Sequence, residues 1–362
     1  MNLQHSRHGG NIWQIAKEYK IPIEKIIDFS TNINPLGIPN RVENKLIENM
    51  HLISYYPDPY CSQFIQKLSE TLCIKKENIL VGNGSTELIY TISAAISPKK
   101  VVIPIPTFSE YENSVKAHNA EIEFYICREE NNFKINIARM IKLLPYSQMI
   151  FVCNPNNPTG SVLSKEELVF LAKKCQQNNV LLLIDETYIN FVIDDEDFTM
   201  IHNIDNNQII VLRSFTKFFA IPGLRLGYMV ANKNIIEKIK KFQPVWSVNI
   251  LAQIAACEII KDKEYIQKTK EYIQIQAKIL RGHFVDIYDI IKPYPTVTNF
   301  ILCRFNRSYN YNHIFRRLIQ EHGIIVRNCS NFRRLSNRYF RVAIRTEKEN
   351  KKLIHAFWKV LE

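Results

Sequence analysis

The sequence predicts a doubly wound α/β domain joined to a smaller α/β domain, and three observations support this fold class. Short apolar runs rich in β-branched residues alternate with amphipathic segments between about residues 99 and 232, as in sheets covered by helices on both faces. After residue 284 the pattern changes to strand, helix, strands and a last helix, which suits a second, smaller unit. A chain of 362 residues, 46% of them hydrophobic, can also bury a sizeable core.

The strands expected in the large domain are continuous apolar runs. They lie at residues 101–105, 121–126, 149–153, 180–185, 209–214 and 225–231. A further run, NILV, precedes the helical segment ELIYTISAAI. Ser164 and Glu167 form a capping box that begins a helix between two of the strands.

The remaining elements are expected at the two ends of the chain. A long helical region should run from Asn249 to about Phe284, with one break near residues 261–264. Beyond it we expect strands at 299–305, 324–329 and 339–345, a helix at 311–323 and a last helix from Glu347. An amino-terminal helix near residues 11–20 and the irregular STNINPLGIP should pass along the edge of the small domain. The predicted parts are therefore an arm at 1–45 that joins the small domain, a large domain at 46–284 and a small domain at 285–362.

The net charge limits the kinds of ligand that the protein can bind, and the cysteine pattern limits the kinds of metal site and disulfide that it can contain. The 47 Lys and Arg residues against 35 Asp and Glu residues give a net charge of +12, which is compatible with nucleic acid, a membrane surface or small acidic ligands. No block of consecutive basic residues favours the first two, so we expect no nucleic acid and no membrane, and the positive charge could still draw a small phosphorylated substrate toward the protein. The first twenty residues lack a signal-peptide pattern, and the eight cysteines show no CxxC pair or zinc spacing. We therefore expect a cytoplasmic protein with reduced thiols and no metal site.

The segment SFTKFFAIPGLR predicts a reactive lysine beside an anion site. Lys217 follows a buried strand and is flanked by three phenylalanines, and burial among apolar groups lowers the pKa of an amine toward the neutral nucleophile. The hydroxyls of Ser214 and Thr216 and the guanidinium of Arg225 are donors that suit a phosphate dianion. On this segment alone, a lysine that ends a strand in solvent is an equally good interpretation.

Two segments upstream favour the reactive lysine. NPNNPTG follows strand 149–153, and its turn-forming residues build a rigid loop where α/β sheets bind ligands, so that Asn157 can donate to a ring oxygen. DETY ends the next strand at the same edge, where Asp185 can keep a pyridine nitrogen protonated. Tyr188 can share the same ring oxygen with Asn157.

A glycine-containing loop offers a second contact for phosphate. Gly84, Ser85 and Thr86 lie between an expected strand and the start of a helix, where backbone N–H groups and hydroxyls bind anions. The loop lacks the third glycine of GxGxxG, and no GxxxxGK[ST] occurs, so a dinucleotide fold and a P-loop NTPase are both disfavoured. Phe108 follows strand 101–105 and can stack on a planar ring, although most aromatic side chains at such positions belong to the core.

Taken in order, GNGSTE, IPTF, NPNNPTG, DETY and SFTK…PGLRLGY resemble the fold-type I aminotransferase superfamily, class I/II branch, over nearly the whole chain. The resemblance implies pyridoxal 5′-phosphate (PLP) as the cofactor, carried as a Schiff base on Lys217. It also implies that Asp185 binds the pyridine nitrogen and that Asn157 and Tyr188 bind the ring oxygen O3′. The phosphate would be held by Gly84, Ser85, Thr86, Ser214, Thr216 and Arg225. Tyr56, in YYPDPY, matches a tyrosine that reaches the cofactor of the neighbouring subunit, which implies a homodimer with shared active sites.

Two branches of the superfamily compete, the histidinol-phosphate aminotransferases and the threonine-phosphate decarboxylases of cobalamin biosynthesis. HGGN at 8–11 and DFSTNINPLG at 28–37 are similar to decarboxylase segments that line the substrate site. By this resemblance His8, Gly9 and Arg327 would hold the substrate phosphate, and Asn32 and Arg341 would hold the α-carboxylate.

The substrate-binding arginines rest on the resemblance alone. Four other arginines crowd the same region, so composition does not select the pair; they are Arg333, Arg334, Arg338 and Arg345. With the decarboxylase match, phosphothreonine would lose CO₂ and yield (R)-1-aminopropan-2-yl phosphate.

Three alternatives remain at this point. The same motifs serve an aminotransferase, and a decarboxylase of phosphoserine differs by one methyl group, worth only ~1–3 kcal/mol in a pocket. A non-catalytic PLP-fold sensor joined to a DNA-binding module is disfavoured, because only about 45 residues precede the large domain.

Overall fold

The apolar runs form adjacent strands of one seven-stranded sheet in the computed structural model, which describes residues 8–205 and 208–362. The strands are β2 (Ile79–Gly82), β3 (Lys100–Ile105), β4 (Glu121–Ile126), β5 (Met149–Cys153), β6 (Leu181–Asp185), β7 (Ile209–Ser214) and β8 (Gly227–Ala231). Their order is β2-β8-β7-β6-β5-β3-β4; β8 is antiparallel to both of its neighbours, whereas the pairs from β7 to β4 are parallel.

Alternate residues of these strands enter two separate hydrophobic clusters. In β6, Leu182 and Ile184 belong to one cluster, and Leu181 and Leu183 belong to the other. The first cluster is covered by α2 (Asn40–Glu48), α3 (Ser62–Leu72), α6 (Ile137–Met140), α7 (Lys165–Gln177) and α9 (Ile250–Ile259). The second is covered by α4 (Gly84–Ile96), α5 (Ser109–Lys116) and α8 (Lys233–Lys240). Helices on both faces confirm the doubly wound arrangement.

The order of the sheet reverses between two of its central strands. β3 and β5 are neighbours in the sheet. The chain leaves β3 toward β4 on one side, whereas it leaves β5 toward β6 on the other side, so these two connections run in opposite directions. In open α/β sheets ligands bind outside the carboxyl ends of the strands at such a reversal. The loops that follow β3 and β5 carry Phe108 and Asn157.

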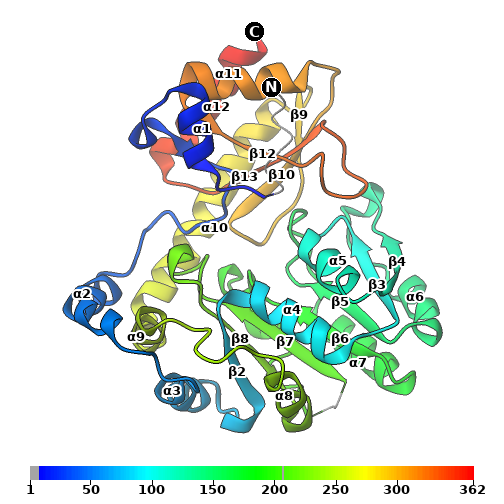
Figure 1. The fold of residues 1–362 in the computed structure, drawn as a ribbon. Helices are drawn as coiled ribbons and strands as arrows, with labels where there is room; N and C mark the ends of the chain where they lie inside the picture. The colour runs from blue at the N-terminus through cyan, green and yellow to red at the C-terminus, as the bar shows by residue number, and fades with distance from the viewer. Residues whose placement is uncertain (1–7, 206–207) are drawn as a thin grey trace.

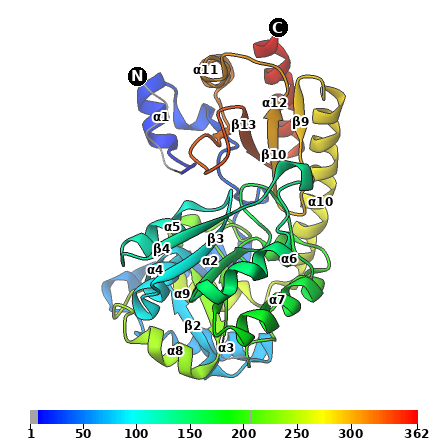
Figure 2. The same ribbon diagram turned by 90° about the vertical axis from the view of Figure 1, so that its right-hand side faces the viewer.

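A smaller body lies at one end of the large sheet (Figure 1). Its four-stranded sheet has the order β12-β13-β10-β9. The strands are β9 (Ile291–Pro293), β10 (Phe300–Phe305), β12 (Arg327–Asn328) and β13 (Tyr339–Ala343), accompanied by α1 (Ile12–Tyr19), α11 (Tyr311–His322) and α12 (Glu347–Leu361). The long α10 (Lys263–Asp286) runs from the large body to the small one, as Figures 1 and 2 show from two sides. The predicted break in the helical region is confirmed, because α9 ends at Ile259 and α10 begins at Lys263.

The structure divides one expected strand, adds a short strand that pairs with part of it, and adds another strand in the small sheet. The run 324–329 is two strands, β11 (Ile324–Ile325) and β12, and β11 pairs in parallel with β1 (Ile27–Asp28) in a sheet of its own. Because β1 lies near the start of the chain, no local pattern could reveal this pairing. The other added strand, β9, is short and ends in a proline, which hides it from an alternation pattern.

The domain boundaries expected at residues 45 and 284 fall inside α2 and α10. The first seven residues of the expected arm lie outside the described residues, and the division into three parts stays a prediction. Within the described ranges, the helices are all too short or too polar to cross a bilayer.

Candidate active site

A cavity of about 80 Å³ lies at the carboxyl ends of β5, β6 and β7, beside the amino-terminal end of α4. It is lined by most of the residues that the motifs predict as cofactor ligands: Ser85, Thr86, Phe108, Asn157, Asp185, Tyr188, Ser214, Thr216, Lys217 and Arg225. The sequence analysis missed three other lining residues, Tyr111, Cys153 and Thr187.

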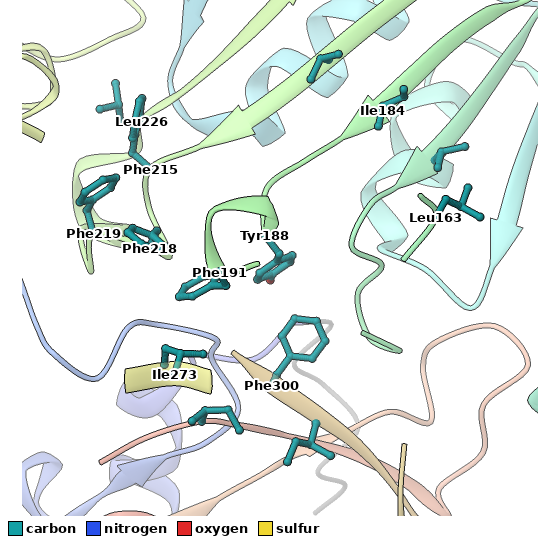
Figure 3. Close-up of a cluster of buried hydrophobic side chains, with 14 of the residues drawn as sticks. Leu163, Ile184, Tyr188, Phe191, Phe215, Phe218, Phe219, Leu226, Ile273 and Phe300 are labelled. Atoms are coloured by element: carbon teal, nitrogen blue, oxygen red, sulfur yellow. The ribbon is translucent and has the colours of Figure 1, made fainter. Parts of the chain in front are cut away.

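Lys217 lines the cavity from the loop after β7. The neighbouring Phe215, Phe218 and Phe219 are buried, and Figure 3 shows the three rings clustered on this loop. Burial lowers the pKa of Lys217 to about 8, and the positive charges of nearby arginines, Arg225 first, add to the effect. The amine is therefore available as a nucleophile near neutral pH.

Asp185 ends β6 and is only 3% exposed. Its Oδ1 accepts the backbone N–H of Thr187 at 2.9 Å, and its Oδ2 accepts the hydroxyl of Tyr111 at 2.7 Å. Burial raises the pKa of Asp185, whereas these hydrogen bonds lower it by stabilising the carboxylate. Tyr111 lies three positions after Phe108, one helical turn into α5, and this spacing was the only sequence signal for its approach.

The opposite end of the cavity suits a phosphate group. Gly84 has a φ of +80°, and a Cβ added there would lie 2.6 Å from Nη2 of Arg225. Ser85 and Thr86 follow in the first turn of α4, while the hydroxyls of Ser214 and Thr216 lie 2.8 Å apart at the end of β7. Hydroxyls, a guanidinium and a helix amino terminus together form a site for an anion.

The small body and the amino-terminal segment contact residues that line the cavity. Arg341 on β13 donates through Nη1 to Oδ1 of Asn157 and through Nη2 to the backbone oxygen of Ser30 at 2.7 Å. Asn32 donates to the hydroxyl of Tyr188 at 3.0 Å. Burial raises the pKa of Tyr188 to about 12. Figure 3 shows the Tyr188 ring facing Phe300.

A second pocket, of about 100 Å³, is lined by His8, Gly9 and Arg327 among others. Arg327 lies directly opposite Arg341 in the register of β12 and β13, and burial lowers its pKa to about 10. His8 forms a 2.8 Å hydrogen bond with Glu110, and its ring lies 5.6 Å from that of Phe108. A Cβ at Gly9 would lie 2.3 Å from the backbone oxygen of Ser30, so the arm packs closely there.

Tyr56 lines neither of the two pockets described above. Its side chain is 80% exposed and packs against Trp246, with ring centroids 4.8 Å apart. The structure thus brings together the other residues predicted to bind cofactor or substrate, and leaves Tyr56 on the surface.

A match to a protein-family model over most of the sequence shows which family the chain belongs to. Residues 24–357 match the aminotransferase class I and II family. The chain belongs to this family. Membership confirms the predicted fold class, a fold-type I PLP-dependent transferase, and PLP as the predicted cofactor.

Relatives of two activities resemble this aminotransferase-family chain. The threonine-phosphate decarboxylase of Salmonella typhimurium is 35% identical over 362 residues, covering 100% of this chain and 98% of that protein. The structure of L-threonine-O-3-phosphate decarboxylase from Porphyromonas gingivalis has a TM-score of 0.83 and 27% identity, covering 93% of this chain and 99% of its own. The histidinol-phosphate aminotransferase from Clostridium acetobutylicum has a TM-score of 0.86 and 31% identity, covering 92% and 99%.

The cavity of this family member fits PLP. Asp185 is a buried carboxylate whose pKa is raised by burial, and a protonated pyridine nitrogen is a cation that would offset the cost of burying it. The space beside Gly84 is open because this residue has no Cβ, and the surrounding donors suit a dianion. Lys217 supplies the amine, and Asn157 and Tyr188 supply polar groups beside it.

Proposed function

We propose that the protein is a PLP-dependent decarboxylase that converts O-phospho-L-threonine into (R)-1-aminopropan-2-yl phosphate for the nucleotide loop of cobalamin. One observation carries the proposal: two buried arginines lie opposite each other, Arg341 at the cofactor cavity and Arg327 at the neighbouring pocket. Phosphothreonine has two anionic groups, and a guanidinium is a natural receptor for each. The full-length relationship to a threonine-phosphate decarboxylase supports the same substrate.

We assign the α-carboxylate to Arg341 and Asn32. Nε of Arg341 is buried and has no hydrogen-bond partner among the described residues, so it can donate to a carboxylate oxygen. Unpartnered buried polar atoms are costly, and a ligand can satisfy the arginine donor directly. Asn32 is held in place because Nδ2 of Asn299 donates to its backbone oxygen at 2.8 Å.

We assign the substrate phosphate to Arg327, His8 and Gly9, which line one pocket. His8 and Gly9 reach it from the amino-terminal arm, and Arg327 reaches it from β12. Holding the phosphate and the carboxylate at separate arginines fixes the rotation of the substrate about its α-carbon.

This rotation decides which bond breaks. When bound, PLP supplies an electron sink for the pair released at the α-carbon. By holding the two anionic groups, Arg327 and Arg341 would set the rotation of the substrate so that the bond from the α-carbon to the carboxylate breaks; CO₂ would leave, and the electron pair of that bond would be left at the α-carbon. Lys217, whose pKa is about 8, is suited to deliver the proton that this carbon then takes up.

We propose that the protein is a cytoplasmic homodimer in which Tyr56 reaches the cofactor phosphate of the partner. Large apolar side chains are exposed around Tyr56 and Trp246, among them Ile53, Tyr55 and Val245, and such clusters favour a protein interface. All eight cysteines are free thiols, which suits a reducing compartment.

The test supplies phosphothreonine to the holoenzyme and measures CO₂, then supplies histidinol phosphate with 2-oxoglutarate and measures glutamate. We expect CO₂ from phosphothreonine and no glutamate. Glutamate without CO₂ would replace the proposal with a histidinol-phosphate aminotransferase. A larger kcat/KM for phosphoserine than for phosphothreonine would change the substrate but keep the reaction.

The phosphate assignment has its own test. Arg327→Ala should raise the KM for phosphothreonine strongly while the absorbance of the bound cofactor stays unchanged, because Arg327 lines the second pocket rather than the cofactor cavity. An unchanged KM would overturn the assignment.

A further inference from the structure

The connection between β12 and β13, residues 329–338, reaches from the small sheet to α5 of the large body. In both ribbon views this orange segment descends toward α5 (Figures 1 and 2). Arg333 makes the contact: its Nε and Nη2 donate to Oε2 and Oε1 of Glu112, each at 2.6 Å. Its guanidinium also lies 4.4 Å from the ring centroid of Phe124 on β4. The connection is thus fixed by a bidentate ion pair and a cation–π contact.

The two residues before Arg333 hold Arg327. Nη2 of Arg327 donates to Oδ1 of Asn331 at 2.7 Å, and its guanidinium lies 5.2 Å from the ring centroid of Phe332. Three consecutive residues therefore connect Glu112 on α5 to the orientation of Arg327. A shift of the connection would move two of the groups that orient this guanidinium, whose Nη1 also donates to the backbone oxygen of Asn328.

We propose that Glu112 and Arg333 are positioning residues that fix Arg327 for the substrate phosphate, and this inference rests on the proposed function of Arg327. Neither residue lines either of the two site pockets, so each acts through the connection. Glu110, two positions earlier on α5, contacts His8 on the other side of the same pocket. The start of α5 thus contacts His8, which lines the phosphate pocket, and the connection that holds Arg327.

Because the Arg333–Glu112 ion pair is partly exposed, its effect on the position of Arg327 can be distinguished from its effect on the stability of the fold. The side chain of Arg333 is 46% exposed and that of Glu112 is 16% exposed, and exposed ion pairs contribute little to folding. A displacement of a binding group by a fraction of an ångström, in contrast, weakens binding strongly. Loss of the pair should therefore change phosphate binding much more than it changes the melting temperature.

The experiment compares the holoenzymes of Arg333→Ala, Glu112→Gln and the double variant. The matched control is Lys116→Ala, which removes the other cation of Glu112 and leaves the connection untouched. Three quantities are measured at constant ionic strength. They are the KM and the kcat for CO₂ release from phosphothreonine, and the apparent Kd for inorganic phosphate, obtained from the rise in Tm.

Each single variant should raise the KM and the Kd for phosphate about tenfold, with kcat and cofactor absorbance nearly unchanged. The double variant should match the single variants rather than multiply their effects, because both break one contact. Lys116→Ala should behave like the wild type.

Phosphate binding and KM within twofold of the wild type in both single variants would overturn the inference, as would multiplicative effects in the double variant. Failure of the proposed function looks different: the wild type itself would release no CO₂ from phosphothreonine. The inorganic-phosphate titration still tests the pair in that case, since it depends on Arg327 and not on the reaction.

Discussion

The lowered pKa of Lys217 can be tested on the apoenzyme with pyridoxal, which has the aldehyde of PLP but no phosphate. Lowering the pKa from 10.5 to about 8 corresponds to roughly 3 kcal/mol, at about 1.4 kcal/mol per pH unit. At pH 7.5 about a quarter of the amine is then neutral, against about 0.1% for an ordinary lysine. Attack on the aldehyde requires the neutral amine, so the rate should rise with pH and level off above about 8.

The measurement traps the adduct by borohydride reduction and quantifies the modified Lys217 by mass spectrometry across the pH range. Arg225→Met should move the midpoint to higher pH, because Arg225 is the largest charge that lowers this pKa. A wild-type midpoint near 10.5 would show that the pKa of Lys217 is not lowered. An unchanged midpoint in Arg225→Met would show that Arg225 does not lower it. The same pKa shift makes the stability of the apoenzyme depend on pH. The pKa of Lys217 is lower in the folded protein than in the unfolded chain. The contribution of Lys217 to stability is therefore fully present above pH 10.5 and is lost as the pH falls through about 8. Lys217→Met should therefore make the apoenzyme more stable at pH 7.

Other predictions concern the cofactor cavity and the dimer. Gly84→Ala forces a positive φ on a residue with a Cβ, which costs about 1–2 kcal/mol, and displaces Arg225. The PLP affinity, measured by equilibrium dialysis, should therefore fall at least about tenfold. An unchanged affinity would contradict this prediction. Tyr111→Phe removes a donor to a buried carboxylate, and urea unfolding at pH 7.5 should show a loss of about 1.5–3 kcal/mol, whereas a loss near zero would argue against that contact. If active sites are shared, Tyr56→Ala and Lys217→Ala proteins should regain activity when their subunits exchange, and no gain on mixing would count against the shared site.

The sequence predicted the cofactor cavity better than the substrate side. Lys217, Asp185 and Asn157 follow strands that are continuous apolar runs, and the carboxyl ends of parallel strands meet at one edge of a sheet. Local pattern therefore placed these residues together. Tyr111 was missed because its contact with Asp185 depends on the rotation of α5, and its spacing from Phe108 was the only local signal.

Among the crowded arginines, tertiary contacts make a distinction that composition could not make. Arg327 and Arg341 are buried, whereas Arg333 pairs with Glu112 and Arg345 pairs with Glu349. The separation of β11 from β12 also depends on pairing with β1, almost the whole chain away. Such contacts between distant segments have no signature in one sequence.

The proposed reaction breaks the bond between the α-carbon and the carboxylate. Phosphothreonine labelled with ¹³C in its carboxylate is incubated in D₂O with the holoenzyme and 2-oxoglutarate, and the products are followed by NMR. We expect release of the label as CO₂ and one deuterium on the carbon that carried the carboxylate. Retention of the label in a 2-oxo acid, with formation of glutamate, would contradict it.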